Sequence, residues 1–90
     1  MVQKYFVKDP SAVLDYRIDW STWLGADTIS IVTWSVPTGI TKVSSSNDST
    51  SATIWLSGGT AGTIYEVTCR IVTAGGRTDD RTIGITIEDQ

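Results

Sequence analysis

The sequence predicts an all-β fold, an antiparallel β-sandwich of about seven strands. Three observations support this prediction. Apolar side chains recur at every second position in four separate segments, as they do in strands with one buried face. Clusters of turn-forming residues separate these segments at intervals of roughly 8–12 residues. No long segment shows helical periodicity, and we expect one domain over residues 1–90.

Four segments carry the alternation most clearly: residues 14–20, 53–56, 65–71 and 82–87. In each of them one parity is apolar and the other is mostly polar or charged, so each predicts a strand with one face in the core. The predicted inward positions are Leu14, Tyr16, Ile18 and Trp20; Ile54 and Leu56; Tyr65, Val67, Cys69 and Ile71; and Ile83, Ile85 and Ile87.

Residues 28–36 predict a fifth strand with an irregularity. The apolar parity changes between Ile31 and Val32, which indicates a β-bulge or a bend. We expect Trp34 to be the inward, central residue of this strand.

Edge strands are predicted at three places. Residues 5–7 and 40–43 are expected to form short edge strands. The last strand, residues 81–88, is also placed at an edge, where it would be free to pair with another chain by β-augmentation.

The segments between strands carry turn signals. Residues 20–24 predict a single helical turn, and residues 74–77 a hairpin turn, because glycine tolerates positive φ. Residues 57–63 are glycine-rich and predict a crossover between sheets. Residues 44–51 are polar and serine-rich, and we expect them to form a mobile surface loop.

The composition excludes several classes of partner. Ten acidic residues against seven basic ones give a net charge of −3, without the basic patch expected of a nucleic-acid or membrane-surface protein. The N-terminal apolar run is too short for a signal peptide, and no run approaches the roughly 20 apolar residues of a membrane span. We therefore expect folding in a reducing cytoplasm.

The inventory of reactive side chains argues against an enzyme. The chain has no histidine and one cysteine, so no Ser-His-Asp or Cys-His arrangement and no zinc site can form. We expect Cys69 to be a buried core thiol. The glycine-rich residues 57–62 lack the lysine and the helix of a phosphate-binding loop. No catalytic residue, cofactor or metal ligand is predicted.

Two kinds of residue are candidates for partner contact. Asp79 and Asp80 are of the type that binds calcium, but the flanking Arg77 and Arg81 are expected to pair with them instead. Among the tryptophans, Trp20 and Trp34 have the parity of the core. Trp55 lies between two inward residues and should face outward, and Trp23 lies in a turn. Exposed tryptophan is enriched at interfaces, so Trp55 and Trp23 are predicted to bind a partner. The charged residues Asp79, Asp80 and Arg81 are the other predicted partner-binding residues.

Residues 61–70, with the run Gly-Thr-Ile-Tyr before an alternating strand, resemble the E–F corner of fibronectin type III domains. In those sandwiches the tyrosine hydroxyl closes the corner by a hydrogen bond to backbone a few residues upstream. The resemblance implies an immunoglobulin-like or fibronectin type III-like sandwich with Tyr65 at its corner.

Four motifs in order resemble a family of small phage and prophage proteins: residues 8–16, 19–24, 55–62 and 76–81. Some members are labelled fibre–tail adaptor. The resemblance implies a virion structural or adaptor protein that acts through protein–protein contacts, with other virion proteins of the tail, fibre or head as partners and with self-association as a further mode. It also implies a location in the virion, assembled in the cytoplasm of the bacterial host.

A second function stays open. Sandwiches often bind sugars on aromatic platforms, so an exposed Trp55 would also suit an immunoglobulin-like carbohydrate-binding module for adhesion to the host surface.

Overall fold

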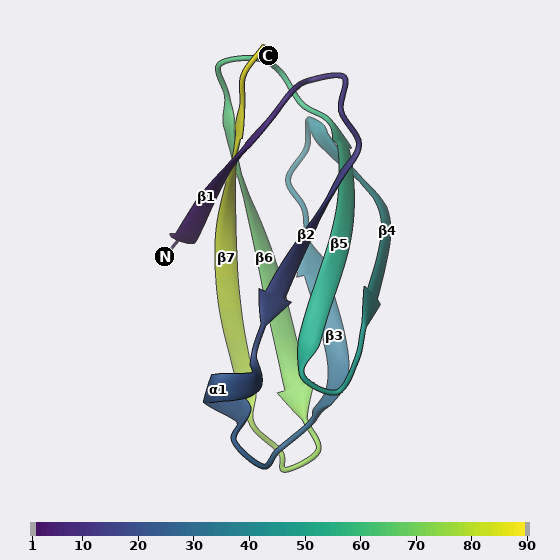
Figure 1. The fold of residues 1–90 in the computed structure, drawn as a ribbon, viewed down its shortest axis with the longest axis vertical. Helices are drawn as coiled ribbons and strands as arrows, with labels where there is room; N and C mark the ends of the chain where they lie inside the picture. Colours follow the sequence, from purple (N-terminus) through teal and green to yellow (C-terminus); the bar gives the residue numbers. More distant parts are fainter. Residues whose placement is uncertain (1, 90) are drawn as a thin grey trace.

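The computed structural model describes residues 2–89, which form seven β-strands and one short helix (Figure 1). In chain order these are β1 (Val2–Lys8), β2 (Leu14–Asp19), α1 (Ser21–Leu24), β3 (Ile29–Ser35), β4 (Ile40–Asn47), β5 (Ser51–Gly58), β6 (Ile64–Thr73) and β7 (Thr78–Ile87). The predicted all-β class is confirmed, and the predicted helical turn corresponds to α1.

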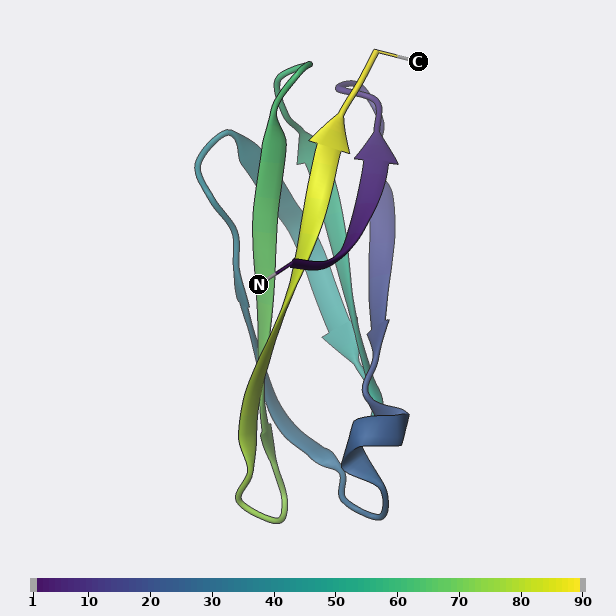
Figure 2. The ribbon, with the colours of Figure 1, turned by 90° about the vertical axis from the view of Figure 1, so that its left-hand side faces the viewer.

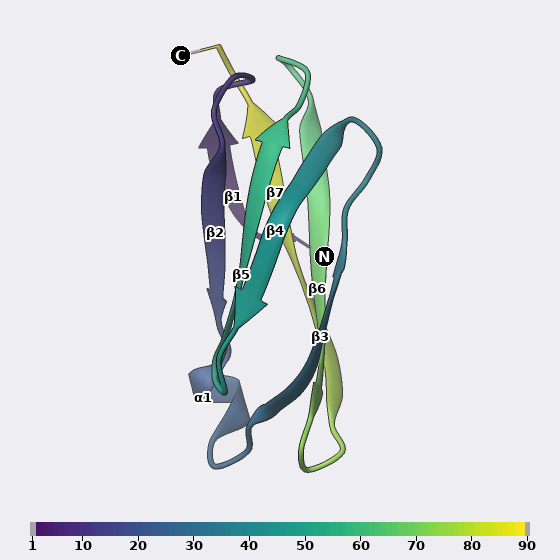
Figure 3. The ribbon, with the colours of Figure 1, turned by 90° about the vertical axis from the view of Figure 1, so that its right-hand side faces the viewer.

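The strands form two sheets packed face to face. One sheet has four strands in the order β1-β7-β6-β3, and the other has three in the order β2-β5-β4. Figure 2 views the molecule with β1, β7 and β6 toward the reader, and Figure 3 with β2, β5 and β4 in front. This arrangement confirms the predicted immunoglobulin-like sandwich.

The inward parity of the strands fills the space between the sheets. The predicted inward residues of β5, β6 and β7 are all buried, and Trp20 is completely so. The prediction for Leu14 is wrong: its side chain is 39% exposed, because it begins an edge strand. The buried apolar residues are Tyr16, Ile18, Trp20, Leu24, Ile29, Ile40, Ala52, Ile54, Leu56, Tyr65, Val67, Cys69, Ile71, Ile83, Ile85 and Ile87.

Pairing with β1 places the last strand, β7, inside its sheet and not at the predicted edge. β1 is an edge strand, as predicted, but it pairs with β7 in parallel, whereas the other strand pairs are antiparallel. β7 therefore lies between β1 and β6, and the prediction that it is an edge strand open to another chain is wrong. The physical reason is that Phe6 and Lys8 of β1 face the core, so the N-terminal segment covers the edge that β7 would otherwise expose.

The serine-rich segment belongs to a strand. β4 extends to Asn47, and β5 begins at Ser51, so the predicted mobile loop over residues 44–51 is wrong. Apart from Ile40, β4 is exposed along its length, and an edge strand of this kind needs no apolar alternation. The turn itself is closed by Asp48, whose carboxylate accepts hydrogen bonds from the backbone N–H groups of Thr50 at 2.9 Å and Ser51 at 2.7 Å.

β3 carries the predicted irregularity. Its register on β6 shifts between Ile29 and Ile31, which confirms an irregularity in this strand, just before the predicted place. Trp34 lies opposite Cys69 and packs against the core, but it is only partly buried. The expected inward orientation of Trp34 is confirmed, but the expectation that it is central is wrong, because β3 is an edge strand of its sheet.

The tyrosine corner forms as the resemblance implied. Tyr65 is buried, and its hydroxyl oxygen accepts a hydrogen bond from the backbone N–H of Thr60 at 3.1 Å. The neighbouring Gly59 has a φ of +101°, and a Cβ atom there would lie 2.7 Å from the side chain of Ile87. The crossover between β5 and β6 therefore requires glycine at this position.

Candidate functional site

The five predicted contact residues do not form one site. Trp55 lies on the outer face of the three-stranded sheet, whereas Asp80 is exposed on the four-stranded sheet. Trp23 belongs to α1, at the end of the sandwich that is lowest in Figure 1, and Arg81 contacts Trp20 next to this helix. Asp79 is half-buried on β7, opposite Ile71.

Trp55 occupies the middle strand of its sheet and points away from the core, as its parity predicted. Its side chain is 40% exposed, and its cross-strand neighbours are Asp15 on β2 and Ser44 on β4. In the next outward row, Thr53 lies between Arg17 and Ser46. A large aromatic side chain among small polar ones on an open sheet face has the composition of an interface centre with a polar rim.

At the end of the sandwich near α1, two neighbouring tryptophan rings are each covered by an arginine. Arg81 lies over the ring of Trp20 at 4.1 Å from its centre, and Arg77 lies over the ring of Trp23 at 4.3 Å. The two indoles meet edge to face, with centres 5.5 Å apart. Arg81 also donates a hydrogen bond to the backbone carbonyl of Asp19 at 3.0 Å. Cation–π contacts of this kind stabilise a structure by about 0.5–2 kcal/mol each.

Arg77 has a second set of partners that fixes it in place. Its guanidinium donates to the carboxylate of Asp27 at 3.1 Å and to the backbone carbonyl of Leu24 at 2.8 Å. A side-chain hydrogen bond from Thr73, together with smaller contributions that include Arg77, lowers the pKa of Asp27 to about 2. These contacts tie α1 to the β6–β7 turn, so the residues at this end serve the fold.

The expected pairing of Asp79 and Asp80 with their flanking arginines is wrong. Asp80 forms its ion pair with Arg70, the residue opposite it on β6, at 2.7 Å, and this hydrogen bond lowers the pKa of the Asp80 carboxyl group. Asp80 and its neighbour Arg81 point to opposite faces of the strand, whereas Asp80 and Arg70 are cross-strand partners on one face, so the sheet register decides the pairing of Asp80.

A buried lysine was missed by the sequence reasoning. Lys8 is almost completely buried, and its ammonium group donates to the backbone carbonyls of Gly58 at 2.7 Å and Asp9 at 2.9 Å. Burial lowers the pKa of Lys8, and the nearby charge of Asp9 opposes this effect. The sequence contains a signal for this burial, because Lys8 has the same inward parity as Phe6. The burial of Lys8 was missed because the strand was predicted to end at residue 7.

The four sequence motifs meet in two pairs. Residues 8–16 contact residues 55–62 through the hydrogen bond from Lys8 to Gly58 and through the pairing of Asp15 with Trp55. Residues 19–24 contact residues 76–81 through the stacking of arginines on Trp20 and Trp23. Lys8, Arg77 and Arg81 of these motifs therefore join parts of the sandwich, whereas the side chain of Trp55 faces outward.

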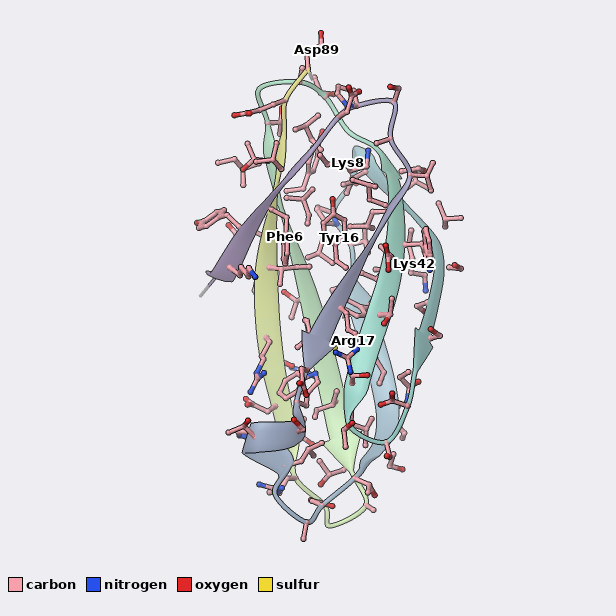
Figure 4. All side chains as sticks on the ribbon, viewed as in Figure 1. Phe6, Lys8, Tyr16, Arg17, Lys42 and Asp89 are labelled. Atoms are coloured by element: carbon pink, nitrogen blue, oxygen red, sulfur yellow. The ribbon has the colours of Figure 1, made fainter. Side chains whose placement is uncertain are left out.

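A pocket lies beside β2, at the side of the sandwich where the edge strands β1 and β2 come together. Its volume is about 150 Å³, and it is lined by Lys4, Phe6, Arg17, Ile18, Arg81 and Ile83. Phe6 reaches across to Tyr16, with ring centres 4.9 Å apart, and Figure 4 shows these two side chains together between β1 and β2. No sequence pattern indicates this pocket, because its walls come from β1 and β2 at one end of the chain and from β7 at the other.

Residues 2–89 also contain neither a candidate metal centre nor a candidate membrane helix. No cluster of three or more histidine, cysteine, aspartate or glutamate side chains is placed to hold a metal ion in this part of the chain. No helix among these residues is long and apolar enough to cross a membrane.

Comparison with known proteins identifies a family and solved structures of similar fold. Residues 8–86 match the family model Gp77, described as podophage GP4 fiber-tail adaptor protein gp77. The structure is similar to the solution structure of the PKD domain from KIAA 1837 protein, with a TM-score of 0.59 and 16% sequence identity over 100% of this chain and 83% of that one. That similarity concerns the fold alone. No curated protein matches the chain.

Proposed function

Since the chain belongs to the family of podophage fiber-tail adaptor proteins, we propose that it is a structural part of the phage particle that joins tail and fibre proteins by protein–protein contacts. The family match over residues 8–86 carries this proposal. The chain acts as a rigid spacer with a recognition surface, and it performs no catalysis. The absence of histidine and the burial of Cys69 support a non-enzymatic role.

The outer face of the three-stranded sheet supplies the best contact surface for that role. Trp55 is the large apolar side chain at its middle, and Asp15 and Ser44 flank it. Binding energy at protein interfaces concentrates in such aromatic residues, with a polar rim that excludes water. Trp23 and Arg81 would contribute only indirectly, because each is held in an arginine–tryptophan contact near α1.

The proposal is tested on purified phage particles. Mass spectrometry should detect the chain in washed virions, and gold-labelled antibody should place it by electron microscopy where fibres meet the tail. Absence from virions, or labelling confined to the head, would overturn the adaptor function.

A sugar-binding role is a second candidate, favoured by the hydroxyl-bearing Ser44, Ser46 and Thr53 beside the exposed indole of Trp55. If it holds, host-surface glycans should change the tryptophan fluorescence of the wild-type protein but leave that of the Trp55→Ala variant unchanged. An identical response of both proteins, or no response in either, would exclude it.

A further inference from the structure

The pocket beside β2 concentrates positive charge in an acidic protein. Resting on the proposed adaptor function, we propose that this pocket binds the carboxylate side chain of a glutamate or aspartate on the surface of a partner virion protein. The charges around the pocket, its size and its position next to Trp55 support this assignment.

Three of the seven basic side chains of the chain line this pocket, namely Lys4, Arg17 and Arg81, although the net charge is −3. None of the three forms an ion pair with a carboxylate of residues 2–89. The other basic residues are differently placed: Lys8 is buried, Arg70 and Arg77 are paired with aspartates, and Lys42 lies on β4.

The carboxylate of Asp19 interacts electrostatically with two of these cations, Arg17 and Arg81. Its pKa is lowered first by hydrogen bonds with Ser21, and then by the charges of Arg17 and Arg81. Its carboxylate accepts the backbone N–H of Ser21 at 2.9 Å and forms no ion pair within the described part of the chain, so this single negative charge offsets only part of the charge of the three cations. An incoming carboxylate would therefore meet an excess of positive charge, which favours specific and fast association.

The small volume of the pocket suits a single amino-acid side chain better than a larger ligand. Small-molecule sites usually enclose roughly 300–1,000 Å³, and the volume here is about 150 Å³. Phe6, Ile18 and Ile83 contribute an apolar lining, which suits the methylene groups of a glutamate while the cations meet its carboxylate.

Arg17 links the pocket to the Trp55 surface, because it lines the pocket and is also a diagonal cross-strand neighbour of Trp55. On β2, Arg17 is two residues from Asp15, the cross-strand neighbour of Trp55, and shares its outward parity. A diagonal pair of this kind is separated by about 7–8 Å, within reach of long side chains. One partner could therefore cover the indole of Trp55 and place an acidic side chain in the pocket.

The test uses the full chain and two capped pentapeptides, one of glutamate and one of glutamine, followed by NMR titration at low salt. The glutamate peptide should shift the backbone amide signals of Phe6, Ile18 and Ile83, and the glutamine peptide should not. Arg17→Gln or Lys4→Gln should weaken binding by about tenfold, as expected for the loss of one close charge contact. Lys42→Gln, with the same charge change on β4, should leave the affinity unaltered.

Several results would overturn the proposal. These are equal binding of both peptides, equal weakening by Lys42→Gln, or no binding to the folded wild-type protein. Self-association that Arg17→Gln abolishes, seen by analytical ultracentrifugation, would overturn it as well, by assigning the pocket to a second copy of the chain. The proposed function is judged separately, because wild-type protein absent from virions would refute it whatever the peptides do.

Discussion

At the scale of single residues, Cys69 shows what burial does to chemistry. Its thiol is fully buried on the inner face of β6, and burial raises its pKa to about 11. Because the thiolate is the reactive form, the native protein should react with a thiol reagent only as fast as it unfolds. Ellman's reagent should therefore label Cys69 slowly in buffer and at once in concentrated guanidinium chloride. Fast labelling of the native protein would contradict this burial.

Asp27 should make stability depend on acidity. The pKa of Asp27 in the folded protein is about 2, below the ordinary value of 3.8. The ionised carboxylate therefore contributes its full stabilisation above pH 3.8 and loses it as the pH falls toward 2. Asp27→Asn should therefore have a lower Tm than wild type at pH 7, and the difference should shrink as the pH falls through this range. Thermal unfolding followed by circular dichroism measures the Tm of both proteins. A difference in Tm that stays the same at every pH would show that the charge of Asp27 is unimportant.

Apart from Leu14 at the start of an edge strand, the side chains whose parity was clear were placed correctly from sequence, and those that depended on sheet order were not. Trp55 faces outward and Cys69 inward, as alternation alone predicts. Trp34 is only partly buried, because its strand lies at an edge, and no pattern within residues 28–36 reveals that position. The partner of Asp80 likewise depends on the register of β7 on β6.

At the scale of elements, β5 offers a direct comparison of its two faces. Ile54 is fully buried and the adjacent Trp55 is 40% exposed. Ile54→Ala should lower the free energy of unfolding by about 2–5 kcal/mol, the usual cost of a large-to-small change in a core. Trp55→Ala should lower it by less than half as much, although more atoms are removed. Urea denaturation of the two variants measures this, and the reverse order would mean that β5 faces the other way.

Strand existence was easier to predict than strand extent. β1 and β4 were both expected as short edge strands, and both are longer than predicted. Edge strands with exposed side chains show little alternation, so a serine-rich segment such as residues 44–47 reads as a loop. The parallel pairing of β1 with β7 joins the two ends of the sequence, which local patterns do not report.

At the scale of the whole molecule, the sandwich is an elongated body of 42 × 23 × 20 Å. Several motif residues make contacts that join different strands and the helix, and they therefore stabilise the fold: Lys8, Trp20, Trp23, Arg77 and Arg81. The folded sandwich exposes Trp55 and the basic pocket on neighbouring surfaces around β2. The sequence motifs could indicate the family, whereas the neighbourhood of Arg17 and Trp55 emerges only from the fold.

The most direct measurement is the amount of Trp55→Ala protein incorporated into purified phage particles, relative to wild type. The matched control is Ile64→Ala, an exposed apolar residue on the other sheet. If the outer face of the three-stranded sheet binds the neighbouring virion protein, Trp55→Ala should reduce incorporation by about tenfold or more, as the loss of an interface hot spot implies, and Ile64→Ala should not. Equal incorporation of a folded Trp55→Ala protein would contradict this.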